Sequence, residues 1–307
     1  MKITIVGAGN VGATTAQRIS SFELAREVVI LDVVEGIARG KALDIYQGAP
    51  LVESDCQVIG TTDYAETAGS QIAVVTAGWS RRPGMSRDDL LVKNAEIVSG
   101  VVRRIVERSP DCLVIVVSSP IDEMTWVALK ASGLDRSRVL GMSGVLDAAR
   151  LRTFIAMELK VAVEDVEATV IGGHGELMLP MLRYATVAGI PVAQLLPANR
   201  VDALIDRTKN AALEIIAELK TGSAYFAPSA AVTAMIEAIV RDKPRIMPCA
   251  LKLEGEYGLS DVVVGVPAKL GRQGVQSIIE LQLNDEERAT FERSAAIVRA
   301  NLTKLAE

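Results

Sequence analysis

Short apolar runs and longer amphipathic segments alternate along the first half of the chain, and this pattern predicts strands separated by helices. The runs are rich in valine, isoleucine and leucine, as is typical of buried strands, and they occupy Lys2–Val6, 28–31, 56–59, 71–76, 112–117 and 138–141. Helices are predicted over 13–20, 33–49, 90–109 and 124–132, with helix or loop at 64–69. The alternation predicts a parallel, doubly wound sheet with right-handed crossovers through about residue 142.

The second half has a different pattern, in which long helices are more frequent than strands. We expect helices at 146–160, 200–219, 227–241 and 284–305, a strand at 166–171, and a meander of strands at 245–253 and 259–267. No repeat, linker or low-complexity tract separates the halves. The predicted fold is therefore α/β with two packed domains, a doubly wound domain at 1–142 and an α+β domain at 143–307.

A glycine-rich turn joins the first predicted strand to the first helix. Gly7, Gly9 and Gly12 have G-x-G-x-x-G spacing, and Asp32 ends the second strand. In this motif the first glycine permits a tight turn, the second lets the backbone approach a pyrophosphate, and the third lets helix and strand pack closely. A carboxylate at the Asp32 position binds ribose hydroxyls and repels the 2′-phosphate of NADP, so the pattern predicts NAD binding. The alternative is an ordinary glycine-rich turn.

Composition and charge argue against several classes of partner. The net charge of −5 gives no support to nucleic acid or to an anionic membrane surface. No apolar run is long enough for a membrane helix, and the start of the chain lacks the pattern of a signal peptide. Cys56, Cys112 and Cys249 are scattered without metal-ligand spacing, so we expect reduced thiols, no metal site and a cytoplasmic protein.

His174 is the only histidine of the chain and the first candidate for acid/base chemistry. It follows a predicted strand and is flanked by glycines, so the backbone can present its imidazole at a strand end. Asp147 and Arg150 lie three residues apart on one helix face. Such a carboxylate suits a buried histidine, and such a guanidinium suits a substrate carboxylate. The alternatives are a core histidine and a surface salt bridge.

A charged segment follows the strand predicted at 71–76. It reads WSRRPGMSRDD, and its Pro-Gly pair predicts a turn in an exposed loop. Arg81, Arg82 and Arg87 lie in it and could meet an anionic substrate. The alternative is a solvated, charged loop without a ligand.

Together these motifs resemble the malate/lactate dehydrogenase family, and within it the malate dehydrogenases that are similar to lactate dehydrogenase. The motifs are GAGNVG with LDVVEG, GKALD, SRRPGMSR, GVLDAARLRTFIA, GGHG and KTGSAYFAP, and the resemblance covers essentially the whole chain. It implies that 1–142 is a Rossmann domain that binds NAD and that 143–307 is the catalytic, substrate-binding domain.

The resemblance also implies a role for each candidate residue. His174 matches the catalytic acid/base, Asp147 its carboxylate partner, and Arg150 the residue that binds the substrate's 1-carboxylate. Arg87 matches the arginine that polarises the 2-oxo group, and Arg81 the specificity position, where the family usually has arginine for malate and glutamine for lactate. The implied activity is NAD-dependent and reversible hydride transfer between malate and oxaloacetate.

The positions that match the family's cofactor contacts lie in the glycine motif and at later strand ends. They are Gly7, Gly9, Asn10, Val11, Gly12, Asp32, Asn94, Val117 and Ser119. Ser119, also expected to contact substrate, stands where the family normally has asparagine, and serine lacks the reach of an amide, so we expect impaired or altered turnover. Trp79 stands where a small or aliphatic residue is usual, and Glu176 where GGHGD is usual. The family implies a cis bond before Pro120.

Other functions remain open on the sequence alone. A dehydrogenase of another 2-hydroxy acid, such as lactate, is one alternative, and Arg81 is the residue that favours malate dehydrogenase over it. A glycosidase that uses NAD would need a metal site with cysteine or histidine ligands, which the sequence does not predict. A catalytically impaired NAD-binding sensor is favoured only by Ser119. In every case the expected ligand is small, and the family implies a homodimer or homotetramer.

Overall fold

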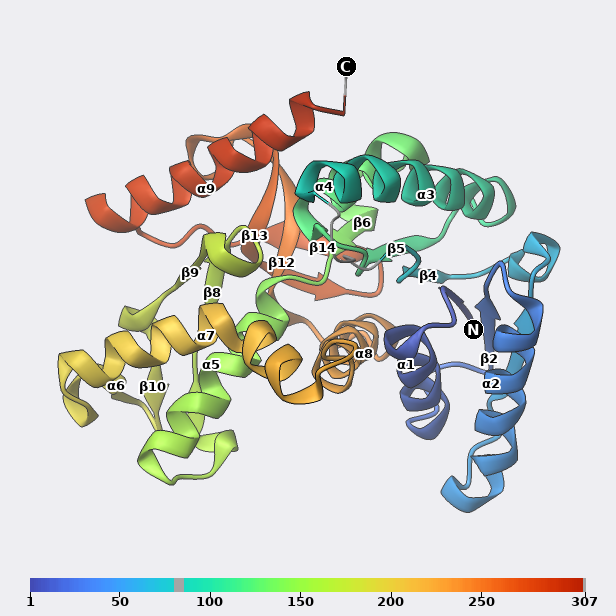
Figure 1. The fold of residues 1–307 in the computed structure, drawn as a ribbon, viewed down its shortest axis with the longest axis horizontal. Helices are drawn as coiled ribbons and strands as arrows, with labels where there is room; N and C mark the ends of the chain where they lie inside the picture. The colour runs from blue at the N-terminus through green and yellow to red at the C-terminus, as the bar shows by residue number, and fades with distance from the viewer. Residues whose placement is uncertain (80–85, 306–307) are drawn as a thin grey trace.

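The structure is a computed structural model, and it describes residues 1–79 and 86–305. In Figure 1 the N-terminal part of the chain, in blue, lies to the right, and most of the later part extends to the left and across the top. Arg81 and Arg82 lie outside the described residues, so the prediction of an exposed loop there is not tested.

A parallel sheet forms the first half, as the alternation of strands and helices predicts. Its strands are β1 (Lys2–Val6), β2 (Glu27–Leu31), β3 (Gln57–Thr61), β4 (Ile72–Val75), β5 (Leu113–Val116) and β6 (Val139–Gly141), in the spatial order β3-β2-β1-β4-β5-β6. The order reverses direction at β1, which pairs with both β2 and β4. In such sheets, ligands bind beyond the C-terminal strand ends near this reversal.

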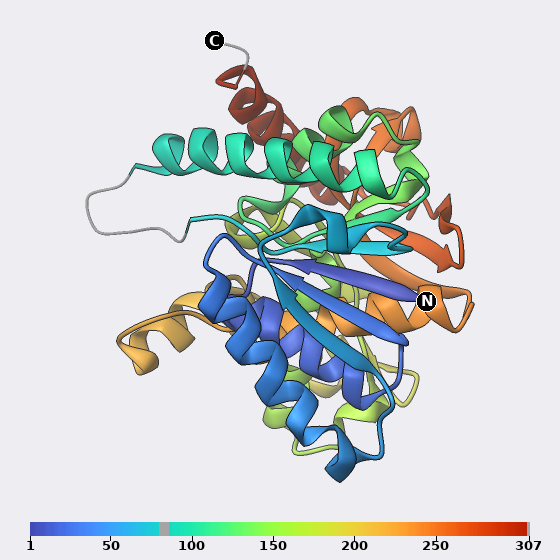
Figure 2. The same ribbon diagram turned by 90° about the vertical axis from the view of Figure 1, so that its right-hand side faces the viewer.

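Helices cover both faces of this sheet, which explains why its strands are apolar throughout. They are α1 (Asn10–Ser21), α2 (Glu35–Gly48), α3 (Arg87–Arg108) and α4 (Ile121–Ser132). Figure 2 shows α3 on one side of the strands and α1 and α2 on the other. Side chains alternate accordingly: Ile3 and Ile5 pack in the cluster that contains α1, while Val6 packs in the cluster that contains α3.

The second half continues the same sheet in antiparallel fashion. Its elements are α5 (Gly144–Leu159), β7 (Val166–Glu167), β8 (Val170–Gly172), β9 (Met178–Pro180), β10 (Thr186–Val187), β11 (Ile190–Pro191), α6 (Val192–Leu195), α7 (Ala198–Leu219), α8 (Phe226–Val240), β12 (Arg245–Glu254), β13 (Ser260–Gly271), β14 (Gly274–Ile278) and α9 (Asp285–Thr303). Strand β12 pairs with β6 through Ala250 and Gly141, and then with β13. The α/β fold with a second, mixed α+β half is therefore confirmed.

The strand predicted at 166–171 is two strands in the structure. Strand β7 pairs with β10 in a small separate sheet, whereas β8 pairs with β13 and β9 in the large sheet. The break between them carries the chain from one sheet to the other. The sequence pattern does not reveal such a change of partner, because it does not show which strand each piece pairs with.

Short 3₁₀ helices fill several connections. They are η1 (Ala49–Val52), η2 (Tyr64–Thr67), η3 (Arg136–Arg138), η4 (Val163–Asp165), η5 (Gly175–Leu177), η6 (Leu182–Tyr184) and η7 (Glu256–Gly258). Helix η2 accounts for the segment that the sequence left as helix or loop. Helix η5 follows His174 directly and so continues the candidate catalytic segment.

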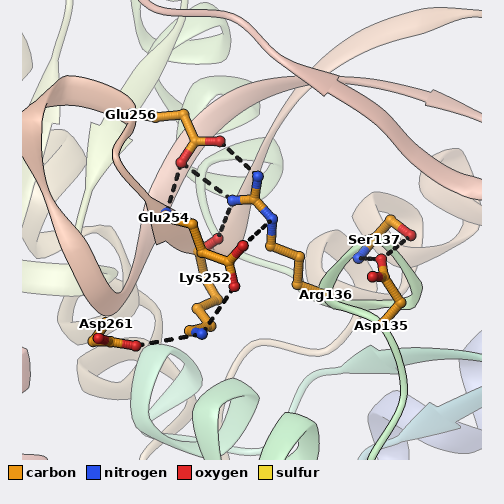
Figure 3. Close-up of polar contacts among 7 residues, drawn as sticks. All are labelled: Asp135, Arg136, Ser137, Lys252, Glu254, Glu256 and Asp261. Atoms are coloured by element: carbon orange, nitrogen blue, oxygen red, sulfur yellow. Dashed lines mark hydrogen bonds and ion pairs between the residues drawn. The ribbon is translucent and has the colours of Figure 1, made fainter.

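A polar cluster links η3 to the β12–β13 hairpin (Figure 3). Arg136 binds Glu256 through two hydrogen bonds of 2.8 and 3.1 Å and lies 3.3 Å from Glu254, while Lys252 contacts Glu254 at 2.9 Å and Asp261 at 3.3 Å. The hydrogen bonds from Arg136 lower the pKa of Glu256 to about 2. The cluster therefore stabilises the contact between the two halves of the chain.

The three cysteines are all buried and free. Burial raises the pKa of Cys56 and of Cys112 to about 11 and that of Cys249 to about 12, so these thiols stay protonated at neutral pH.

Within 1–79 and 86–305, no helix has both the length and the apolar character needed to cross a membrane.

Candidate active site

The glycine motif has the conformation that its spacing predicts. Gly7 has φ +106°, and a Cβ at Gly12 would collide with the Gly7 carbonyl, so the turn needs glycine at both positions. A Cβ at Gly9 would meet nothing within 4 Å. Helix α1 begins at Asn10 without a side-chain cap, so its first N–H groups remain available to an anion. The residues present therefore fit a dinucleotide pyrophosphate.

Asp32 lies beside this turn at the end of β2. Its Oδ2 accepts the Ala8 N–H at 2.7 Å and its Oδ1 accepts the Val34 N–H at 3.0 Å. Lys41 donates to the Ala8 carbonyl at 2.7 Å, which fixes the same turn from α2. Each carboxylate oxygen still has a lone pair for a ribose hydroxyl.

Asn94 and Ser119 come together at the ends of β4 and β5. The Asn94 side chain is 1 % exposed; its amide donates to the Ser119 carbonyl at 2.7 Å and to the Trp79 carbonyl at 3.2 Å, and its oxygen accepts the Trp79 N–H at 2.7 Å. Asn94 thus holds the residue at the start of the charged segment against the loop after β5. Its expected contact with the cofactor stays a prediction.

The loop after β5, which Asn94 contacts, contains one buried serine held by a hydrogen bond and one exposed serine. The buried Ser118 hydroxyl donates to the Ala77 carbonyl at 2.5 Å, whereas Ser119 is exposed and precedes Pro120 through a cis bond, as the family implies. Val117, half-buried, donates its N–H to the Val75 carbonyl at 2.9 Å. The predicted cofactor residues from β5 therefore lie at the C-terminal edge of the parallel strands.

His174, Asp147 and Arg150 come together as predicted. The His174 Nδ1 lies 2.8 Å from Oδ2 of Asp147, and Arg150 lies 3.4 Å from the other Asp147 oxygen. The Asp147 side chain is 1 % exposed, that of Arg150 11 % and that of His174 21 %. The buried carboxylate of Asp147 thus orients the His174 imidazole through Nδ1, and Nε2 is left for another partner.

The electrostatics favour a charged imidazole. Burial lowers the pKa of His174, but the charge and hydrogen bond of Asp147 more than offset that burial, so the pKa lies above its usual value of 6.5. Burial also lowers the pKa of Arg150, against the opposing effect of Asp147. The environment therefore stabilises the protonated form of His174, which can give its proton to an acceptor.

Two further side chains hold the loop before the imidazole, and sequence reasoning missed both. Asp122 of α4 accepts the His174 backbone N–H at 2.8 Å, and Ser294 of α9 accepts the Gly173 N–H at 2.6 Å. Asp122 had a recognisable signal, since an acid in the first turn after a strand end lies at the ligand-binding edge of the sheet. Ser294 had none, because its helix is distant in the sequence.

The imidazole borders a cavity of about 600 Å³. The cavity lies between the first turns of α3 and α4 and the helices α7 and α9, and Ser119, Asp122, His174 and Lys209 are among its lining residues. Arg87 is the first residue of α3, so its backbone lies at this end of the molecule, but its side chain is outside the described atoms. Arg81 lies outside the described residues.

Comparisons with known proteins agree with this geometry. The model of the lactate/malate dehydrogenase NAD-binding domain matches residues 1–141, and that of the family's alpha/beta C-terminal domain matches 144–307. The malate dehydrogenase of Chloroherpeton thalassium is 56 % identical over 305 residues, 99 % of this chain and 98 % of that protein.

Solved structures extend the match to the fold. The malate dehydrogenase of Salinibacter ruber is 49 % identical with a TM-score of 0.96, over 100 % of this chain and 98 % of that one. The lactate dehydrogenase of Cryptosporidium parvum, solved with lactic acid and β-nicotinamide adenine dinucleotide, is 38 % identical with a TM-score of 0.96, over 100 % and 98 %. This chain belongs to the lactate/malate dehydrogenase family.

Proposed function

We propose that the protein is an NAD-dependent malate dehydrogenase, which transfers hydride reversibly between malate and oxaloacetate. The observation that carries the proposal is the 2.8 Å contact of His174 with the buried Asp147, with Arg150 beside it. The same edge of the sheet carries the glycine turn and Asp32. Relatives named malate dehydrogenase, such as that of Chloroherpeton thalassium, cover nearly the whole chain.

In this proposal the protein's own residues bind, orient and protonate the substrate. Arg150 binds the 1-carboxylate, and His174 gives its proton to the oxygen of C2 in oxaloacetate reduction and takes it back in malate oxidation. Asp147 holds the imidazole in the tautomer that leaves Nε2 facing substrate. NAD supplies the hydride acceptor, or donor when reduced. Proton transfer of this kind contributes on the order of 10²–10⁴-fold to the rate.

The charged segment would decide which substrate is used. Arg81 is proposed to bind the second carboxylate of oxaloacetate, and Arg87 to polarise the 2-oxo group and stabilise the oxyanion as it forms. Pyruvate has no second carboxylate, so Arg81 would be desolvated without a partner, at a cost of roughly several kcal/mol. Malate and oxaloacetate should therefore be preferred.

The two halves are proposed to divide these tasks at about residue 142. Residues 1–142 would bind NAD, with contacts from Asn10, Val11, Asn94, Val117 and Ser119, and residues 143–307 would supply the catalytic groups. The change from parallel to antiparallel pairing between β6 and β12 supports this boundary. Asp32 supports NAD over NADP, because its carboxylate would repel a 2′-phosphate.

A homodimer or homotetramer in the cytoplasm is the proposed state. Helix α2 and the turn after it expose a group of large apolar side chains, Ile37, Leu43, Tyr46, Leu51 and Val52, of which Leu51 is 87 % exposed. Exposed apolar side chains in this number on one short segment support a protein–protein contact. Three free, buried cysteines suit a reducing compartment.

A lactate dehydrogenase is the alternative function, and it is not favoured, because relatives 48–56 % identical over nearly the whole chain are named malate dehydrogenase. NADH oxidation by the purified protein should be measured with oxaloacetate, pyruvate and bulkier 2-oxo acids side by side. A strong preference for oxaloacetate supports malate dehydrogenase. A preference for pyruvate would instead identify the protein as a lactate dehydrogenase. Tight NADH binding without turnover of any acid would favour a catalytically impaired, NAD-binding sensor.

A further inference from the structure

Asp122 is a second carboxyl group in contact with the catalytic loop. It is the second residue of α4, and its Oδ2 accepts the backbone N–H of His174 at 2.8 Å. The residue is only 4 % exposed, yet it borders the cavity that contains the imidazole. Asp147 therefore holds the side chain of His174 while Asp122 holds its backbone.

One oxygen of Asp122 is buried without a partner. Its Oδ1 makes no hydrogen bond to any of the described residues, whereas the adjacent buried Glu123 accepts the Asn301 amide at 2.7 Å. Leaving a buried carboxyl oxygen unpaired costs free energy, so packing alone does not account for Asp122 at this position. Burial and the charge of Glu123 raise the pKa of Asp122 to about 7.

Charge distinguishes Asp122 from the other support of this loop. Ser294 accepts the preceding N–H, that of Gly173, at 2.6 Å, and its hydroxyl is neutral. Within residues 1–79 and 86–305, Asp122 and Asp147 are carboxylates that favour imidazolium at His174, and the Arg150 guanidinium opposes it. Asp122 and Ser294 therefore form a natural pair for comparison, because they make equivalent bonds and differ in charge.

We propose that Asp122 is a positioning residue for His174, which fixes the backbone of the catalytic loop and, when ionised, places a second carboxylate beside the imidazole. The proposal deepens the proposed function, since it rests on proton transfer by His174. A single carboxylate would set the imidazole tautomer. Two carboxylates, one on the ring and one on the backbone, also keep the ring in place when it loses its proton.

Because His174 is the only histidine, proton NMR of the full chain can follow its titration without ambiguity. In Asp122→Asn the pKa of His174 should fall by roughly half a unit to one unit. In Ser294→Ala, the uncharged control, it should stay unchanged. The kcat for oxaloacetate reduction should fall by roughly ten- to a hundredfold in Asp122→Asn, with the KM for NADH unchanged.

The wild type offers a test that does not depend on how well the variant folds. Asp122 and His174 titrate over overlapping pH ranges, so the ring resonance should depart from the curve of a single isolated group. An unchanged pKa in Asp122→Asn, an equal fall in Ser294→Ala, or a wild-type curve that fits one isolated group would overturn the proposal. The titration needs no turnover, so a wild type inactive on oxaloacetate would contradict the proposed function and not the role of Asp122.

Discussion

The Nδ1 atom of His174 lies 2.8 Å from Oδ2 of Asp147, although the residues are separated by 27 positions in the sequence. The contact joins a helix of the second half to a loop that follows β8. Because Asp147 is 1 % exposed, its charge acts on the imidazole with little screening by water. Burial lowers the pKa of His174, and Asp147 is therefore the main reason that this pKa lies above its usual value.

Asp147→Asn should lower the rate of oxaloacetate reduction and also the pH above which that rate declines. Oxaloacetate reduction needs protonated His174, whose pKa Asp147 raises, so the rate declines as pH rises through that pKa. In the variant this decline should begin at lower pH, and kcat/KM should fall by about 10²-fold. The pH profile of kcat/KM measures both, and a profile with an unmoved alkaline limb would show that Asp147 does not control the imidazole.

Glu256→Gln should destabilise the fold at neutral pH. Its folded pKa of about 2 lies below the unfolded value, so its stabilisation is present above about pH 4.5 and is lost as pH falls toward 2. The expected loss is about 1–3 kcal/mol in the free energy of unfolding, measured by urea denaturation. Glu254→Gln is the matched control, because Glu254 is 47 % exposed and should cost about 0.5 kcal/mol or less. Equal losses, or a difference that persists at low pH, would contradict this account.

Arg81→Gln should shift substrate preference toward pyruvate. Loss of the charge removes the partner of the second carboxylate and the penalty that pyruvate meets. The ratio of kcat/KM for oxaloacetate to that for pyruvate should fall at least roughly tenfold. Arg82→Gln is the matched control from the same segment. If both variants change the ratio alike, the effect belongs to the general charge of the segment.

Ser119→Asn tests whether serine at this position limits turnover. Ser119 is exposed, and its carbonyl is already held by Asn94 at 2.7 Å, so the backbone can present a longer side chain to the cavity. We expect a higher kcat or a lower KM for oxaloacetate from steady-state kinetics. If both constants become worse, the site is adapted to serine.

Much of the fold was predictable because its strands are short, apolar and separated by helices. Residues 2–6 were predicted without error, since the run is bounded by the glycine turn. Helices α1, α3 and α4 begin at residues 10, 87 and 121, each three positions before the predicted start. The reason is shared: their first turns consist largely of polar or small residues at the sheet edge, which lack the apolar spacing that reveals a helix.

The candidate site was predictable where a motif spans a few residues, as for Asp147 with Arg150. Contacts that depend on packing were not predictable in the same way. The bonds of Asn94 to Trp79 and Ser119 join two strand ends, and Asp122 reaches His174 across 52 positions. Such contacts depend on tertiary structure: the sequence indicates that Asp122 lies at the sheet edge, but not that it binds the backbone of His174.

The measurement that tests the central claim most directly is oxaloacetate turnover by His174→Asn together with its affinity for NADH. We predict that kcat falls by on the order of 10²–10⁴-fold while the Kd for NADH, from its fluorescence, stays within about twofold of the wild type. That result would assign proton transfer to His174 and leave the cofactor site intact. Retained turnover with unchanged NADH binding would remove His174 from the mechanism and contradict the account.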